Sequence, residues 1–309
     1  LKHQLCEISS NRTRFIYPEK NSEFFEVYEA IKETLLKVDE PVSFKELQEK
    51  MSDSPFGIKQ GLHPLVFMAF YLCHQQEMAI YEDGQFRPYL DTESLERFIR
   101  TKTNTFSFEL YDSKEQTGII DFYSDTSIVK DKKSITSLQA AKNLTKFMNS
   151  LPDYVRFTDL GLSEQAKTFR ATFFSSKSPQ DLFNKDIPRV LGYDTLKPKD
   201  KTKFNKSLSD SLNELGRSYE RLLLNFRAKF TEAFEFGEDL NLKLLRQELF
   251  TRYSSLEEKA LGSTRVFLKK LMEPETEDQF WFENLLNHLA TKHPQKWRDE
   301  DILHAEQRL

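Results

Sequence analysis

The chain has 309 residues, enough for two or three domains that each bury a core of their own. Its 45 basic and 49 acidic residues nearly balance, so no overall charge draws it to nucleic acid or to a membrane surface. Phenylalanine is common at 27 and glycine is scarce at 9, a composition typical of a helix-rich protein with large cores.

The cysteine content and the length of the apolar runs indicate the cellular compartment. Cys6 and Cys73 cannot form a disulfide framework, which indicates the reducing cytoplasm. No apolar run is as long as a membrane span, so we expect no membrane partner. The chain starts at Leu1 with no secretory signal before the first predicted helix, and we expect it to be a trimmed form or a piece of something longer.

The first predicted helix follows a connector at residues 1–21 that could hold one short strand. Apolar residues then recur at helical spacing and predict one amphipathic helix over residues 22–37, with Phe24, Tyr28, Ile31 and Leu35 on its buried stripe. Ser43 and Glu46 form a capping box, which predicts a short second helix.

A third helix begins at Pro64, because proline suits the first turn of a helix. It continues through the run from Leu65 to Cys73, which is apolar on every side. Exposing half of such a helix would leave several large side chains in water, so we expect it to be buried all round as the core of its domain.

Two short strands flank Asp83 and Gly84, and Asp-Gly is a strong signal for a hairpin turn. Three helices followed by a hairpin is the order of a winged helix, which we assign to residues 22–123. A winged helix that reads DNA needs polar and basic residues on its third helix, and few are present here. Packing against another domain or chain is therefore favoured, and the candidates for DNA contact are Lys45, Lys59, Gln60, His63 and Arg87.

The rest of the chain is predicted to be mainly helical. Phe106–Leu110 alternates as a strand that could pair with residues 119–123, before a polar linker at 124–133. A helical subdomain is expected at 134–196 and a helical bundle at 197–309. One long helix of the bundle carries a coiled-coil-like seam, for which internal partner helices are expected; the seam comprises Leu208, Leu212, Leu215, Tyr219, Leu222, Phe226, Phe230 and Ala233.

Catalytic motifs are largely missing. The stretch from Gly57 to Gly61 has neither the spacing nor the Gly-Lys pair of a phosphate-binding loop, so we predict no cofactor in this chain. His3 with Cys6, or His288 with His293, does not complete a set of metal ligands, and we assign no metal site.

Among the enzyme hypotheses, the one that the residues favour most is a Mg²⁺-dependent nuclease. Its carboxylates would be Asp121 or Asp125 together with Asp131, and Lys133 would position water. A solvated loop explains the same residues. The acidic cluster Trp297–Asp301 is best interpreted as a helix start, with acids near its N-terminus and Trp297 as a packing anchor.

Three stretches together resemble the region beyond the nucleotide-binding core of large bacterial phage-defence ATPases, such as the BREX ATPases. They are Pro55–Pro64 with Tyr81–Phe86, then Ser178–Gly192, and finally Pro294–Asp301. The resemblance implies a cytoplasmic, ATP-driven and DNA-associated antiviral machine whose motor lies upstream of Leu1, with other domains or subunits of a defence complex as partners. The missing phosphate-binding loop departs from a whole family member, so any ATPase activity would reside outside this chain.

We therefore expect a non-catalytic docking and assembly module of such a protein. The first alternative is a winged-helix module that binds duplex DNA, and the second is the nuclease.

Overall fold

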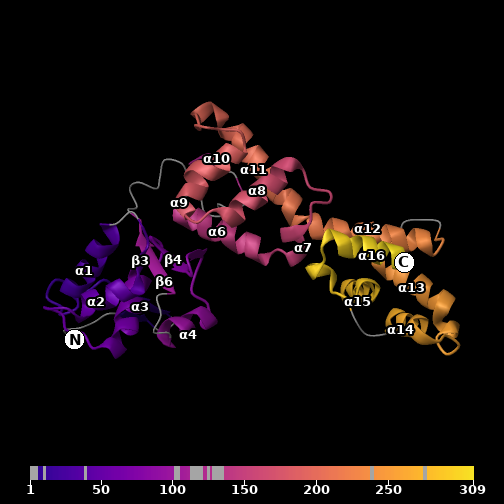
Figure 1. Cartoon of the computed structure of the whole chain (residues 1–309), viewed down its shortest axis with the longest axis horizontal. Helices are drawn as coiled ribbons and strands as arrows, with labels where there is room; N and C mark the ends of the chain where they lie inside the picture. Colours follow the sequence, from indigo (N-terminus) through magenta and orange to yellow (C-terminus); the bar gives the residue numbers. More distant parts are fainter. Residues whose placement is uncertain are drawn as a thin grey trace. The chain divides into compact units, whose positions relative to one another are not determined.

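A computed structural model describes most of the chain (Figure 1). The described residues are 6–9, 12–37, 40–100, 105–111, 121–123, 126, 136–236, 240–273 and 277–309. The protein is mainly helical with a small antiparallel sheet, as the sequence predicts. It divides into two compact units: unit 1 comprises Leu1–Met148 and Ala171–Ser209, and unit 2 comprises Asn149–Arg170 and Asp210–Leu309.

The first helices of unit 1 form where the sequence predicts them. Helix α1 spans Phe25–Leu36 and buries a stripe that includes Tyr28 and Ile31. Strand β3 (Val42–Ser43) leads into α2 (Phe44–Ser52). The Ser43 hydroxyl oxygen accepts the Glu46 backbone N–H at 3.2 Å, so the predicted N-cap is present. The Glu46 carboxylate accepts from the Ser43 hydroxyl at 2.8 Å, whereas in a full capping box it would accept the Ser43 backbone N–H.

Helix α3 spans His63–Cys73 after the short 3₁₀ turn η1 (Gln60–Leu62). Strands β4 (Met78–Glu82) and β5 (Gln85–Arg87) follow as an antiparallel hairpin. The residues between them, Asp83 and Gly84, both have positive φ, which confirms the predicted two-residue turn.

The sheet has the order β3-β6-β4-β5, and all of its pairs are antiparallel. Helix α4 (Thr92–Arg100) lies between β5 and β6 (Phe106–Leu110) in the chain. The predicted pairing of β6 with residues 119–123 is wrong within the described part, because residues 121–123 form the 3₁₀ turn η2 and both edges of β6 are taken by β3 and β4.

Alternation along the strands gives the sheet two apolar faces. Phe106, Phe108 and Leu110 join the core formed with α1–α4, which lie next to the strands in Figure 1. The opposite face carries Ala79, Tyr81 and Tyr111, and Leu138 of α6 (Ser137–Ser150) packs against it.

The remaining elements of unit 1 are short. Strands β1 (Cys6–Ser9) and β2 (Arg12–Phe15) pair as a separate hairpin within the predicted connector. Tyr123 of η2 is buried against Phe183 and Phe204, and its hydroxyl donates to the Phe183 carbonyl at 2.7 Å. The surrounding elements are α9 (Pro179–Asp181), η3 (Leu182–Asp186), α10 (Ile187–Val190) and η4 (Pro198–Asp200).

The predicted long helix is two helices, α11 (Lys201–Gly216) and α12 (Ser218–Ala233). Gly216 lowers the helix propensity at this point, which accounts for a break at Arg217. Every residue of the predicted seam except its last, Ala233, is nonetheless buried, so the helical spacing identified the inner face correctly up to Phe230.

Helices α12 to α16 pack together in unit 2 (Figure 1), as expected for internal partners of the seam. Their bounds and those of the other elements of this part are α7 (Asp153–Phe157), α8 (Glu164–Ser175), α13 (Leu242–Tyr253), η5 (Ser254–Leu256), α14 (Gly262–Leu271), α15 (Asp278–Ala290), η6 (Pro294–Lys296) and α16 (Asp299–Arg308).

Candidate functional site

The outer face of α3 is an exposed apolar surface of unit 1. It consists of Leu65, Met68 and Leu72, at i, i+3 and i+7, with Leu62 just before the helix. Leu65 is 65% exposed, Leu62 and Leu72 are exposed, and Met68 is partly buried. The prediction that α3 is buried on all sides is therefore wrong, because the core covers only the side that carries residues such as Phe67 and Phe70.

The outer face of α3 carries no charge. Between Leu62 and Cys73 the sequence holds no lysine or arginine. Lys59 and Gln60 are exposed just before the helix. His63 is 0% exposed, and its Nε2 lies 2.8 Å from the Ile58 carbonyl oxygen, so its inclusion among surface contacts for DNA is corrected.

The other two DNA candidates each face a carboxylate. Lys45 is exposed, with its Nζ 3.8 Å from Glu49 Oε1, a surface pair too weak to hold it. Arg87 Nε lies 3.1 Å from Glu82 Oε2 on the neighbouring strand. The structure thus gives Arg87 a partner within the sheet.

Glu82 joins the hairpin to α4. Its side chain is buried, and it accepts a hydrogen bond from Arg97 Nε at 2.7 Å and one from the Ser94 hydroxyl at 3.3 Å. The Arg97 hydrogen bond is the main reason that the pKa of Glu82 lies below its usual value. The role of Arg87 and Arg97 around this buried carboxylate is to compensate its charge.

Lys142 of α6 is a buried cation on the other side of the same sheet. Its Nζ donates to the Gln75 carbonyl at 2.7 Å and to the Met78 carbonyl at 3.1 Å. Burial, helped by nearby Lys146, lowers the pKa of Lys142 to about 8. Nothing in the sequence pattern of α6 indicates that Lys142 is buried, because a lysine in an amphipathic helix is expected on its polar face.

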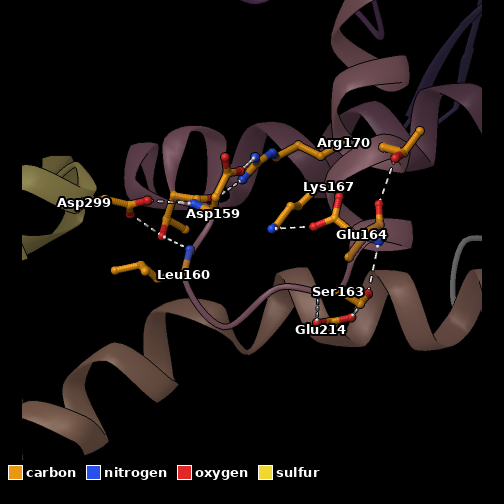
Figure 2. Close-up of polar contacts among 11 residues, drawn as sticks. Asp159, Leu160, Ser163, Glu164, Lys167, Arg170, Glu214 and Asp299 are labelled. Atoms are coloured by element: carbon orange, nitrogen blue, oxygen red, sulfur yellow. Dashed lines mark hydrogen bonds and ion pairs between the residues drawn. The ribbon is translucent and has the colours of Figure 1, made fainter.

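The acidic cluster before α16 is a helix start, as predicted. Trp297 is buried against the Phe226 ring, and its indole N–H donates to the Lys292 carbonyl at 2.6 Å. Asp299 was predicted only as an acid near the helix N-terminus, but it also accepts specific hydrogen bonds. Its carboxylate accepts the Thr158 hydroxyl at 2.6 Å and the Asp159 backbone N–H at 3.0 Å (Figure 2).

The stretch between α7 and α8, here called the 158–163 connection, is held from several directions (Figure 2). Buried Arg170 donates to the carbonyls of Val155 and Thr158 and to the Asp159 carboxylate. Glu214 of α11 accepts both the backbone N–H and the hydroxyl of Ser163, at 2.5 and 2.6 Å.

These carboxylates and Arg170 are engaged in hydrogen bonds to the connection, so they fix its course rather than offer a reactive group. Ser163 also caps α8, because its hydroxyl oxygen accepts the Ala166 N–H at 3.2 Å. Nothing in the pattern around Glu214 or Asp299 pointed to their partners.

The residues of the nuclease hypothesis are mostly not placed. Asp125, Asp131 and Lys133 lie outside the described residues, and Asp121 begins η2. Among the residues that the structure describes, no group of three histidine, cysteine, aspartate or glutamate side chains is arranged to hold a metal ion. His293 lies 3.5 Å from the buried Glu283 carboxylate.

No protein-family model, curated protein or solved structure matches the chain. Across the described part, no helix combines the length and the apolar character needed to cross a membrane. Function is therefore inferred from the structure itself, and first from the outer face of α3. The resemblance to defence ATPases stays a prediction.

Proposed function

We propose that the chain is a non-catalytic docking and assembly module, and that the outer face of α3 is its contact with another protein. The observation that carries this proposal is the exposure of Leu65 in the first turn of an apolar helix. Leaving such side chains in water is unfavourable, at roughly 1.5–3 kcal/mol for a fully exposed leucine, and a protein partner would bury them.

The surrounding fold supports the same proposal. We propose that the elements α1, β3, α2, α3, β4 and β5 form a winged helix, a fold in which the third helix is the usual contact element; their order along the chain supports this. Here β6 lies between β3 and β4, so the sheet is wider than a single hairpin would make it. We assign this winged-helix frame a protein-binding rather than a groove-reading role.

The wider context comes from the resemblance to bacterial phage-defence ATPases. We propose that the module belongs to such an ATP-driven protein and joins its other domains or subunits, with the motor in another part. Finding a phosphate-binding loop with its lysine in the complete gene supports this context, and a complete gene without one contradicts it.

Leu65→Glu tests the docking face directly. The substitution puts a charge on an exposed position, so the fold should persist while a protein contact there is lost. The measurement is the subunit composition of the defence complex purified through the tagged natural protein. Leu261→Glu is the matched control, because Leu261 is an 81% exposed leucine in unit 2. A complex that keeps all its subunits with Leu65→Glu contradicts the proposal.

DNA binding is the alternative that exposed Lys59 and Gln60 and weakly paired Lys45 favour. A titration with duplex DNA at increasing salt separates the two functions, because contacts to phosphate cause a steep loss of affinity with salt. The docking proposal expects no binding at low salt. Salt-sensitive binding that Lys59→Ala weakens would favour the DNA alternative.

A further inference from the structure

Unit 2 contains a groove of about 370 Å³ along α12, near the low end of the range for ligand pockets. One wall is formed by Leu160 and Gly161 of the 158–163 connection and another by α16. All of its lining residues belong to unit 2. The groove is thus a feature of one compact body.

The floor of the groove is apolar and firmly supported. It includes Tyr154, Leu222, Phe226 and Ile302, all of which are buried. Trp297 packs against the Phe226 ring from behind, with ring centroids 5.2 Å apart. These side chains are close-packed and almost fully buried, so the floor has a fixed shape, and the exposed apolar surface of the groove lies at its rim.

The wall at Leu160 is fixed by the contacts described above. Asp299 and Glu214 bind the two ends of the 158–163 connection, and Gly161 turns it with φ near 67°. Leu160 itself is 49% exposed at the rim. This apolar rim is therefore presented by a rigid segment.

Charges differ between the two ends of the groove. Arg221 lines it near the N-terminal end of α12 and donates one N–H to the Glu214 carbonyl, leaving other donors on its guanidinium. Exposed Glu232 lines the opposite end, where Glu306 is already paired with Lys229 at 3.3 Å. Arg221 and Glu232 are eleven positions apart, which is about 16 Å along a helix.

We infer that this groove binds an amphipathic helix of another protein. An apolar stripe over about three turns would cover the floor, an acidic residue would face Arg221 and a basic residue would face Glu232. The two opposite charges select the occupant. A segment with a single sign of charge would leave one of them unmatched, and a wholly apolar segment would leave both unmatched. The site is distinct from the outer face of α3 and does not depend on it.

A displayed library of random 16-residue peptides, selected on the full chain, tests the inference. Peptides that also bind the Leu160→Glu chain are removed in a counter-selection. We expect the survivors to carry an acid and a base about three turns apart, with apolar residues at helical spacing between them. No enrichment, or enrichment of peptides without this pattern, overturns the inference.

The charge match is then tested with a fluorescein-labelled survivor in an anisotropy titration. Glu232→Lys should weaken binding at least tenfold, and exchanging the basic residue of the peptide for glutamate should restore it. Glu248→Lys, on the exposed side of α13, is the matched control and should leave the affinity unchanged. Leu65→Glu should also have no effect, which keeps this test independent of the α3 face. Equal binding to the wild-type and Glu232→Lys chains refutes the assigned site.

Discussion

Helices α3 and α12 are both rich in large apolar side chains, but they use them differently. In α12 the seam residues recur every three or four positions, and Tyr219, Leu222, Phe226 and Phe230 are all buried, whereas Leu224, which does not follow this spacing, is exposed. In α3 they are continuous, and Leu65 and Leu72 remain exposed. A periodic apolar pattern indicates which side of a helix faces the core, whereas a continuous apolar run does not.

Phe226→Ala tests the α12 side of this comparison and should have the largest effect. Phe226 is 1% exposed and contacts Trp297, so its truncation leaves a cavity in a packed core. We expect the free energy of unfolding of unit 2 to fall by roughly 3–5 kcal/mol. Urea unfolding followed by tryptophan fluorescence measures it, because Trp281 and Trp297 both lie in unit 2. A loss below about 1 kcal/mol would show that this seam is loosely packed.

Lys142 gives a pH dependence in unit 1. Its pKa in the folded protein is about 8, below the usual value for lysine, so the unfolded chain binds more protons at pH between 8 and about 10. The contribution of Lys142 to stability should therefore rise with pH in that window, by on the order of 2 kcal/mol. Calorimetric unfolding at pH 7, 8, 9 and 10 should show it as a growing difference between the wild type and Lys142→Met.

Tyrosines set the upper limit of the same experiment. Burial, together with neighbouring Tyr111 and Glu109, raises the pKa of Tyr81, so from about pH 9 upward the unfolded chain loses protons that the folded protein keeps. Both chains then lose stability alike. If Lys142→Met follows the wild-type curve throughout, the buried ammonium does not titrate in this window.

Asp299→Ala tests the contact that holds α16 to the 158–163 connection. The substitution removes the acceptor of the Thr158 hydroxyl and of the Asp159 N–H, which should cost about 1–2 kcal/mol in unit 2. Glu300→Ala is the matched control, since this exposed acid also lies in the first turn of α16. Equal losses in the two variants would assign the effect to the helix dipole instead.

The comparison also explains what the sequence could predict. Local rules located the Ser43 cap, the Asp83-Gly84 turn and the seam of α11 and α12, because each depends on residues within a few positions of one another. The Asp299 contact joins residues 141 positions apart, and the burial of Lys142 depends on carbonyls of a distant turn. Neither leaves a trace in periodicity or capping.

The strand β6 shows the same limit within the sheet. Its alternation identified it as a strand, but not that it would enter between β3 and β4. That position is decided by which of several apolar strands best completes the core, a property of the whole unit. The order of the sheet, and with it the placement of Glu82 beside α4, could therefore not be read from the sequence.

Leu65→Ala completes the comparison with the smallest expected effect. Because Leu65 is largely exposed, its truncation opens no cavity, and the free energy of unfolding of unit 1 should change by less than about 0.5 kcal/mol. Val66→Ala on the buried side of the same helix is the control and should lower stability measurably. Calorimetric unfolding of the full chain gives both values. A large loss at Leu65 would mean that the residue packs within unit 1, and the outer face of α3 would then no longer be available to a partner.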